Sequence, residues 1–192
     1  MKAIGTQTLI TEDLILRRFE LSDAPAMFSN WAGRPDNVTY LIWPAHADLD
    51  VTQTILERWV AAYQDGGTFI WAITLKSQPD QVIGDISALD YVPATNSMTI
   101  GYVLGRDYWG KGYMTQALIA VSRFLLQEAD LNRLIATHDT ANPGSGRVMQ
   151  KAGFHFEGIL RQAMHNNQGI VDSAHYSLLK SDLRSEERRV GK

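Results

Sequence analysis

A strand, a glycine-bearing loop and an amphipathic helix follow one another between Ile100 and Leu125. The helix is predicted because apolar residues at 114, 118, 121 and 125 recur at the spacing of one helical face. This order places the backbone N–H groups of residues 110–114 at a helix N-terminus, where they lack an intrahelical acceptor and the helix dipole adds positive charge. Lys111 adds a full charge, and Gly110 and Gly112 let a ligand approach the backbone. The segment therefore predicts an anion site suited to a pyrophosphate.

A nucleotide triphosphate loop is an alternative reading of the same segment. Gly105, Gly110 and Lys111 fit its spacing G-x-x-x-x-G-K. That motif continues with Ser or Thr, whose hydroxyl binds magnesium, but Gly112 stands there. The intervening residues 106–109 are also bulky for a loop that wraps around phosphate, so we expect a different kind of phosphate loop.

The six residues Trp109-Gly110-Lys111-Gly112-Tyr113-Met114 resemble the coenzyme A loop of the GNAT N-acetyltransferases, whose common form is Q/R-x-x-G-x-G/A. Trp109 stands where Gln or Arg is usual, and Met114 where Gly or Ala is usual. Both departures resemble the branch related to the ribosomal-protein N-terminal acetyltransferases of the RimJ/RimL type.

A second block, residues 142–154, is similar to that branch's N-x-x-S…K-x-G-F-x-x-E-G segment and continues to Glu157-Gly158. The opening Leu14-Ile15-Leu16-Arg17-Arg18-Phe19 and the closing segment 172–179 also fit. Two independent blocks in the right order make the resemblance specific. It implies a single N-acetyltransferase domain over residues 8–183.

The fold implied by the resemblance is α/β, with a mixed, mostly antiparallel twisted sheet of about seven strands flanked by about four helices. The residue patterns agree with this. They predict strands at 14–19, 69–75, 82–91, 97–104, 134–137, 154–162 and 170–179, and helices capped by Ser22, from Val51, through 114–125 and over 143–152. A turn is expected at Ser77-Gln78-Pro79-Asp80, and an inward stripe at positions 51, 55, 59 and 63.

The last nine residues, 184–192, resemble an in-frame translation of a common sequencing-library adapter. A charged, solvated tail is the alternative interpretation. We interpret the segment as an artefact and exclude it from the functional argument.

Composition excludes several classes of function. The 18 basic and 21 acidic residues give no electrostatic case for a nucleic acid or an anionic membrane. Zero cysteines removes disulfides and thiolate ligands, and the five histidines form no metal-ligand pair, so no metal is expected. No secretory signal or membrane-spanning segment is expected, which makes a cytoplasmic enzyme the default. Dimers are common among similar proteins, so a homodimer stays open.

Acetyl-CoA is the co-substrate that the resemblance implies. Backbone groups of Tyr102, Val103 and Leu104 would pair with its pantetheine arm as with an added strand. The alternative is that these are ordinary central-strand residues. The implied cofactor-binding residues are Trp109, Gly110, Lys111, Gly112, Tyr113, Met114, Thr115 and Asn142.

Ser145 is the candidate catalytic residue. In the similar branch, Asn at the position of Asn142 contacts the cofactor arm, and Ser three residues later can bond the departing sulfur, since a hydroxyl can donate to a thiolate. Capping of the helix by Asn142 before Pro143 is an alternative compatible with this role. Many GNAT enzymes place a Tyr acid where this chain has Met149.

No general base is assigned. The usual Glu of the family would precede Ile100, but Thr99 stands there and cannot accept a proton at neutral pH. Other acceptors near predicted strand ends, or a bound water, remain alternatives. These acceptors are Asp85, Asp90, His138 and His175.

Trp31, Tyr40 and Trp43 lie where this family forms one wall of the acceptor cleft, although aromatic residues more often belong to the core. We place Asp85 and Tyr176 with them as substrate-binding candidates. Arg161 and Asp172 near the final strands are further candidates for the opposite wall.

The resemblance therefore predicts direct acetyl transfer from acetyl-CoA to a primary amine, either a protein N-terminus or a small amine. The alternative is a non-catalytic acyl-CoA-binding or sensing module. The absent Glu at Thr99 and the absent Tyr at Met149 favour the module, whereas Ser145 favours the enzyme.

Overall fold

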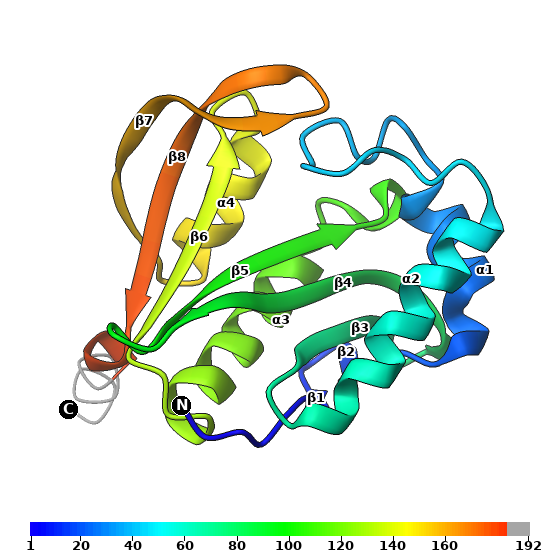
Figure 1. The fold of residues 1–192 in the computed structure, drawn as a ribbon, viewed down its shortest axis with the longest axis horizontal. Helices are drawn as coiled ribbons and strands as arrows, with labels where there is room; N and C mark the ends of the chain where they lie inside the picture. Colours follow the sequence, from blue (N-terminus) through cyan, green and yellow to red (C-terminus); the bar gives the residue numbers. More distant parts are fainter. Residues whose placement is uncertain (184–192) are drawn as a thin grey trace.

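A computed structural model describes residues 1–183 of the chain. In this part of the chain an eight-stranded sheet has the order β1-β2-β3-β4-β5-β6-β8-β7 (Figure 1). The strands are β1 (Leu9–Ile10), β2 (Leu14–Arg17), β3 (Phe69–Leu75), β4 (Gln78–Val92), β5 (Ser97–Leu104), β6 (Arg133–Asp139), β7 (His155–Asn166) and β8 (Gly169–Leu179). The helices are α1 (Ala24–Met27), α2 (Leu49–Ala62), α3 (Tyr113–Arg123) and α4 (Pro143–Lys151).

The mixed, mostly antiparallel sheet is confirmed, because β5 and β6 form its parallel pair and the other neighbours are antiparallel. The strand number is one higher than the expected seven. The difference is β1, a two-residue strand whose pattern is too short to recognise in the sequence. The tail at 184–192, interpreted above as an artefact, lies outside the described residues.

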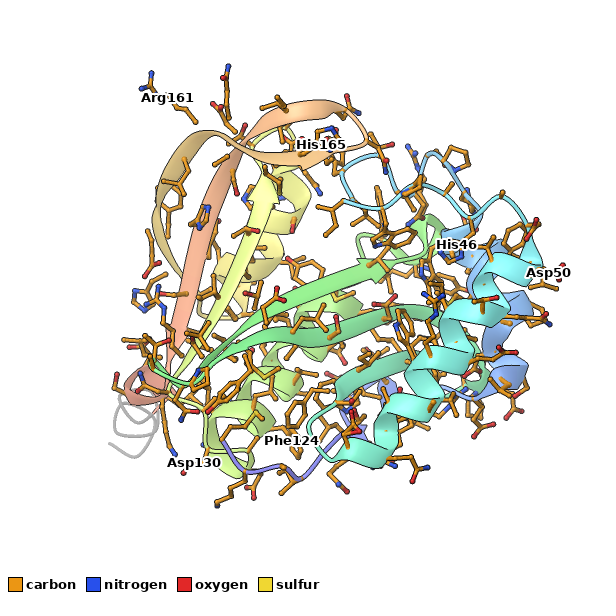
Figure 2. The ribbon with its side chains drawn as sticks, viewed as in Figure 1. His46, Asp50, Phe124, Asp130, Arg161 and His165 are labelled. Carbon is orange, nitrogen blue, oxygen red and sulfur yellow. The ribbon has the colours of Figure 1, made fainter. Side chains whose placement is uncertain are left out.

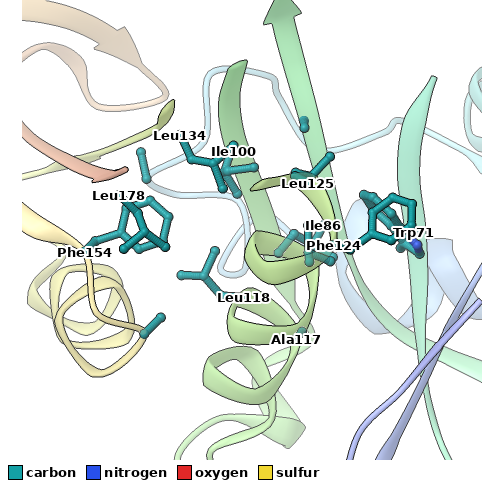
Figure 3. Packing of buried hydrophobic residues seen from close by; sticks show 14 of the residues in the cluster. Trp71, Ile86, Ile100, Ala117, Leu118, Phe124, Leu125, Leu134, Phe154 and Leu178 are labelled. Carbon is teal, nitrogen blue, oxygen red and sulfur yellow. The ribbon is translucent and has the colours of Figure 1, made fainter. Parts of the chain in front are cut away.

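The sheet separates two hydrophobic clusters, one on each face. Helices α3 and α4 cover one cluster, in which Leu118 packs with Phe154 and Leu134 (Figure 3). Helices α1 and α2 cover the other, which contains Trp31 and Leu56. Central strands therefore carry apolar side chains on both faces, since both faces are buried.

Two local predictions were wrong in position: the turn between β3 and β4, and the buried face of α2. The turn between β3 and β4 lies at Lys76 and Ser77, because Leu75 pairs directly with Gln78 and Pro79 is part of β4. Helix α2 exists, but its buried residues are Thr52 and Leu56 rather than a stripe that starts at Val51, which is 40% exposed. A spacing of four residues drifts around a helix that has 3.6 residues per turn, so the buried stripe cannot follow it.

The cap of the first helical segment also differs from the prediction. Glu20, not Ser22, is the N-cap residue of this segment, and the Asp23 carboxylate accepts a hydrogen bond from the Glu20 backbone N–H at 2.8 Å. The Asp23 carboxylate also accepts from both terminal nitrogens of Arg17 at 2.8 Å. The hydrogen bond to Asp23 raises the pKa of the Arg17 guanidinium above its ordinary value, so Arg17 stays charged.

Strands β5 and β6 separate in the middle of the sheet. They pair only from Ser97 to Ile100 and from Arg133 to Ala136. Beyond these residues β5 stays paired with β4, and β6 stays paired with β8. The two strands diverge as the edges of a V (Figure 1), which leaves the β5 backbone from Gly101 onwards without a strand partner on one side.

Candidate functional site

The loop between β5 and α3 forms an uncapped helix N-terminus at the mouth of the V. Gly110 and Gly112 have φ angles of 76° and 81°, in the left-handed region that favours glycine. Gly112 is the N-cap residue, and no side chain caps α3. The first bond of the helix runs from the Gln116 N–H to the Gly112 carbonyl at 3.0 Å, so the N–H groups of residues 113–115 have no intrahelical acceptor. This geometry fits an anion.

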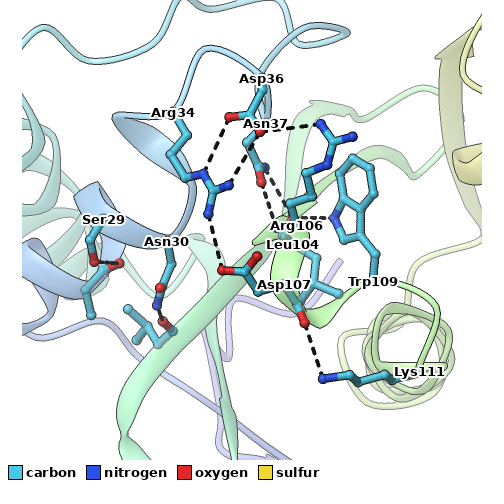
Figure 4. Close-up of polar contacts among 12 residues, drawn as sticks. Ser29, Asn30, Arg34, Asp36, Asn37, Leu104, Arg106, Asp107, Trp109 and Lys111 are labelled. Atoms are coloured by element: carbon cyan, nitrogen blue, oxygen red, sulfur yellow. Dashed lines mark hydrogen bonds and ion pairs between the residues drawn. The ribbon is translucent and has the colours of Figure 1, made fainter.

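Side chains fasten this loop to the end of β5 (Figure 4). The Trp109 indole N–H donates to the Leu104 carbonyl at 2.7 Å, and the Arg106 guanidinium lies 5.5 Å from the centre of the Trp109 ring. The Lys111 ammonium donates to the Asp107 carbonyl at 3.2 Å and is exposed. Arg106 and Lys111 therefore place positive charge beside the open N–H groups.

Asn37 is a positioning residue that the sequence analysis missed. Its Nδ2 donates to the Leu104 carbonyl at 3.2 Å, and its Oδ1 accepts from the Arg106 N–H at 2.8 Å. Beside this contact, Arg34 forms an ion pair with Asp107 at 3.3 Å. Asn37 lies in an irregular segment far from this loop in sequence, so no local pattern indicates the contact.

A second part of this bridge involves Asp36. Arg34 and Arg106 each lie 3.4 Å from its carboxylate (Figure 4). The hydrogen bond from Arg34 lowers the pKa of the Asp36 carboxyl. Asp36 thereby connects Arg106 of the loop with Arg34. These groups are exposed, so the ion pairs contribute little to stability.

The predicted pantetheine-binding residues lie on the unpaired part of β5. Tyr102 and Val103 follow Ile100, the last residue paired with β6. Leu104 differs from them, because its carbonyl already accepts from Asn37 and Trp109. Backbone groups of successive residues point to opposite sides of a strand, and the Gly105 N–H donates to the Ile83 carbonyl of β4. Val103 and Gly101 therefore face β4, and the backbone groups of Tyr102 face the V.

Ser145 and Asn142 lie at the N-terminus of α4, on the other arm of the V. Asn142 is the N-cap, and its Oδ1 accepts from the Ser145 N–H at 3.4 Å. The Ser145 Oγ lies 2.8 Å from the Tyr102 hydroxyl, which also lies 3.1 Å from the Ser145 carbonyl oxygen. Burial raises the pKa of the Tyr102 phenol above its ordinary value, so it stays protonated. The structure thus brings Tyr102, Asn142 and Ser145 together.

Close packing holds α4 against β6. A Cβ at Gly146 would lie 2.7 Å from His138 Nε2, so a larger residue does not fit. His138 Nδ1 lies 2.7 Å from the Asp139 carbonyl, which makes Nδ1 the protonated nitrogen. Among the described residues Nε2 is buried without a hydrogen-bond partner. Tyr176 is 5% exposed and its hydroxyl accepts from Gln150 Nε2 at 3.3 Å, so Tyr176 lies beneath α4 beside His138.

Trp31 and Asp85, two further candidates for contact with the acceptor, lie on the face of the sheet that α1 and α2 cover. Trp31 is fully buried in the cluster there, and contact with an acceptor would require it to move. Asp85, the cross-strand neighbour of Val103, is 8% exposed, and desolvation raises the pKa of its carboxyl to about 7. The Trp31 indole N–H faces Asp85 closely enough to lower this pKa slightly, without reaching hydrogen-bond geometry.

Tyr40 and Trp43 are partly exposed in the segment before α2. That segment touches the tip of the β7–β8 hairpin, because Asn167 Nδ2 donates to the carbonyls of Val38 and Trp43, both at 2.8 Å. In Figure 1 the segment before α2 lies beside the β7–β8 turn, across the wide end of the V. Tyr40 and Trp43 therefore lie near the open end, on the opposite side from Tyr176.

The usual acid and base positions of the family carry no such group here. Met149 is 1% exposed in the core. Thr99 lies in the part of β5 that is still paired with β6. Asp90 lies at the far end of β4, past Ala88, and His175 lies on β8 opposite Thr137.

Within residues 1–183 no group of His, Asp and Glu side chains could hold a metal ion. Figure 2 shows His46 beside α2 and His165 on the β7–β8 hairpin, on separate elements. No helix in the same residues is long and apolar enough to cross a membrane. Arg161, a further candidate for the acceptor wall, lies at the outer edge of β7 (Figure 2).

Comparison with known proteins gives consistent matches. Residues 13–155 match the family described as "Acetyltransferase (GNAT) domain". The uncharacterized N-acetyltransferase p20 of Bacillus licheniformis is 28% identical over 92% of this chain and 98% of its own length. The ribosomal-protein-serine acetyltransferase of Escherichia coli K12 is 34% identical over 69% of this chain and 73% of its own. The structure of RimL, a ribosomal L7/L12 acetyltransferase in complex with coenzyme A, has a TM-score of 0.79 with 22% identity, covering 90% of this chain and 98% of that one.

Proposed function

Because this chain belongs to the GNAT acetyltransferases, in the branch of the ribosomal-protein acetyltransferases, we propose that it transfers an acetyl group from acetyl-CoA directly to a primary amine. One observation carries the proposal. An unpaired stretch of β5 is followed, after the loop of residues 105–112, by an uncapped helix N-terminus, so that an extended arm and an anion can be bound side by side.

Each part of acetyl-CoA has a matching part of the site. Its diphosphate binds the N–H groups of residues 110–115, with Lys111 and Arg106 supplying charge. Its pantetheine arm pairs with the backbone groups of Tyr102 on β5 as an added strand, and Asn142 contacts the arm from the opposite side. The coenzyme A in the RimL structure supports this donor, since that protein shares the fold.

The reaction exchanges one bond for another. The amine nitrogen bonds to the acetyl carbon, the carbon–sulfur bond breaks, and its electron pair stays on sulfur. The nitrogen loses one proton and the sulfur gains one, so the products are an amide and the free thiol. Ser145 donates a hydrogen bond to the departing sulfur, and the N-terminus of α4 favours negative charge there.

The proton of the amine goes to water or to Asp85. Thr99 cannot take it, whereas the pKa of about 7 at Asp85 suits proton exchange near neutral pH. Asp85 lies one strand away from the V, across Val103, so a water molecule would connect it with the amine. Positioning of the two reactants supplies much of the remaining rate.

The leading acceptor is a protein N-terminus, and a small amine is the alternative. The ribosomal-protein acetyltransferases among the relatives support the first. Tyr40 and Trp43 at the open end of the V supply partly exposed aromatic surface that suits a peptide. Asp85 and Tyr176 remain proposed contacts deeper in the site.

Release of free thiol from acetyl-CoA with a panel of N-terminal peptides and small amines tests the proposal. We expect turnover with at least one amine and a loss of about 100-fold in kcat for Ser145→Ala. Ser29→Ala is the matched control, because Ser29 is exposed and its hydroxyl bonds only locally to the Ala26 carbonyl.

Calorimetry with coenzyme A separates the enzyme from its alternative. Tight binding without turnover on any amine identifies an acyl-CoA-binding module, which the buried Met149 and the Thr99 that stands in place of a glutamate would explain. Absence of binding overturns both functions.

A further inference from the structure

The Tyr102 side chain connects the two arms of the V. Tyr102 lies on β5 beyond its last residue paired with β6, and Ser145 lies on α4, which follows β6. The Tyr102 hydroxyl lies 2.8 Å from Ser145 Oγ and 3.1 Å from the Ser145 carbonyl oxygen. The Tyr102 side chain can therefore have a role of its own, besides the proposed pairing of the Tyr102 backbone with the pantetheine arm.

Each of the two hydroxyls has one proton, so they can be arranged in two ways. If Tyr102 donates to the Ser145 carbonyl, Ser145 donates to the phenol oxygen, and the Ser145 hydroxyl proton is not available to the sulfur. If Tyr102 donates to Ser145 Oγ, the Ser145 proton is free to point into the V. A thiolate is a stronger acceptor than a neutral phenol, so a thiolate in the V favours the second arrangement.

We propose that Tyr102 is a positioning residue for acetyl transfer: its hydroxyl donates to Ser145 Oγ and thereby directs the Ser145 proton towards the departing sulfur. The inference rests on the function proposed above. As the carbon–sulfur bond breaks, its electron pair stays on sulfur, and the hydrogen bonds from Ser145 to sulfur and from Tyr102 to Ser145 strengthen together. Tyr102 keeps its proton throughout, so the reaction still removes one proton from the amine nitrogen and adds one to the sulfur.

The surroundings of Tyr102 support this role. Tyr102 is partly buried, and desolvation raises the pKa of its phenol, so the hydroxyl keeps its proton and remains a donor. The α4 position at which the resemblance would place a tyrosine acid holds the buried Met149. In this chain the phenol therefore comes from β5 and reaches the sulfur through Ser145.

Tyr102→Phe tests the proposal, because it removes only the hydroxyl. We expect kcat to fall about tenfold while KM for acetyl-CoA stays within about twofold, since an interaction of the transition state is lost. In a Ser145→Ala background, Tyr102→Phe should cause no further loss of kcat. Titration of the thiol of bound coenzyme A, followed by thiolate absorbance, should have a higher midpoint pH in Tyr102→Phe than in the wild type.

Tyr63→Phe is the matched control for a purely structural hydroxyl. Tyr63 is buried, accepts from the Phe19 N–H at 3.0 Å and donates to the Ile70 carbonyl at 2.9 Å, on the other face of the sheet. It should lower Tm and leave both kcat and the thiol titration unchanged.

The outcomes distinguish this inference from the proposed function. Turnover with equal kcat in the wild type and Tyr102→Phe, additive losses in the Ser145→Ala background, or an unchanged thiol midpoint overturns the role of Tyr102 alone. Failure of the wild type to bind coenzyme A overturns the proposed function, and this inference with it. Binding of coenzyme A without turnover on any amine overturns acetyl transfer, and this inference with it.

Discussion

Replacing Asp85 with asparagine should remove a pH-dependent cost of folding. The Asp85 carboxyl is buried beside Val103 and Trp31, and desolvation raises its pKa from 3.8 to about 7. The folded protein therefore binds a proton at Asp85 that the unfolded chain has released. Stability falls as pH rises from about 4 to about 7 and is constant above that range. An asparagine side chain would occupy the same space without a charge.

The size of the effect follows from the two pKa values. One pKa unit corresponds to about 1.4 kcal/mol, so burial of the ionised Asp85 carboxylate costs about 4 kcal/mol at pH values above 7. Between about pH 5.5 and about pH 8 the cost grows by about 2 kcal/mol. For a chain of 192 residues, the Tm of Asp85→Asn minus that of the wild type should therefore rise by about 6 °C across this pH range.

Urea unfolding and thermal unfolding at a series of pH values measure this difference. The free energy of unfolding of Asp85→Asn relative to the wild type should increase by about 2 kcal/mol as the pH rises from about 5.5 to about 8. Asp90→Asn is the control on the same strand, because Asp90 is exposed and its φ of 55° is one that asparagine tolerates. A stability difference between Asp85→Asn and the wild type that does not change with pH would refute the reasoning.

Three further substitutions test a glycine of the loop, a partly buried ion pair and the packing of α4. Gly112→Ala places a side chain at a φ of 81°, so we expect about 1 kcal/mol of strain and weaker coenzyme A binding by calorimetry; unchanged affinity would contradict this. Asp23→Ala leaves Arg17 without its partner and should cost about 3 kcal/mol in urea unfolding, whereas a loss under about 1 kcal/mol would show that the pair contributes little. Gly146→Ala brings a methyl group to 2.7 Å from His138 and should cost about 2 kcal/mol and lower kcat, because α4 carries Ser145; wild-type kcat and Tm in this variant would argue against the close packing.

Much of the architecture could be predicted from the sequence because its signals are local. The apolar periodicity of the helix after Gly112 and the glycines of the loop act within a few residues of one another, and both are confirmed as parts of one helix N-terminus. The cap formed by Asn142 before Pro143 is confirmed for the same reason. Periodicity does not fix register, however, since it marks a face of a helix only approximately, which explains the wrong stripe that began at Val51.

The sequence by itself determined the order of elements, the loop with its glycines and the family, because each is written in contiguous residues. The tertiary structure alone decided which distant residues meet. Strands β5 and β6 separate after Ile100 only in the folded sheet, and the contacts of Asn37 with Leu104 and of Tyr102 with Ser145 join positions 67 and 43 residues apart. The pKa of Asp85 was decided in the same way, because desolvation depends on neighbours that the chain supplies from other strands and helices.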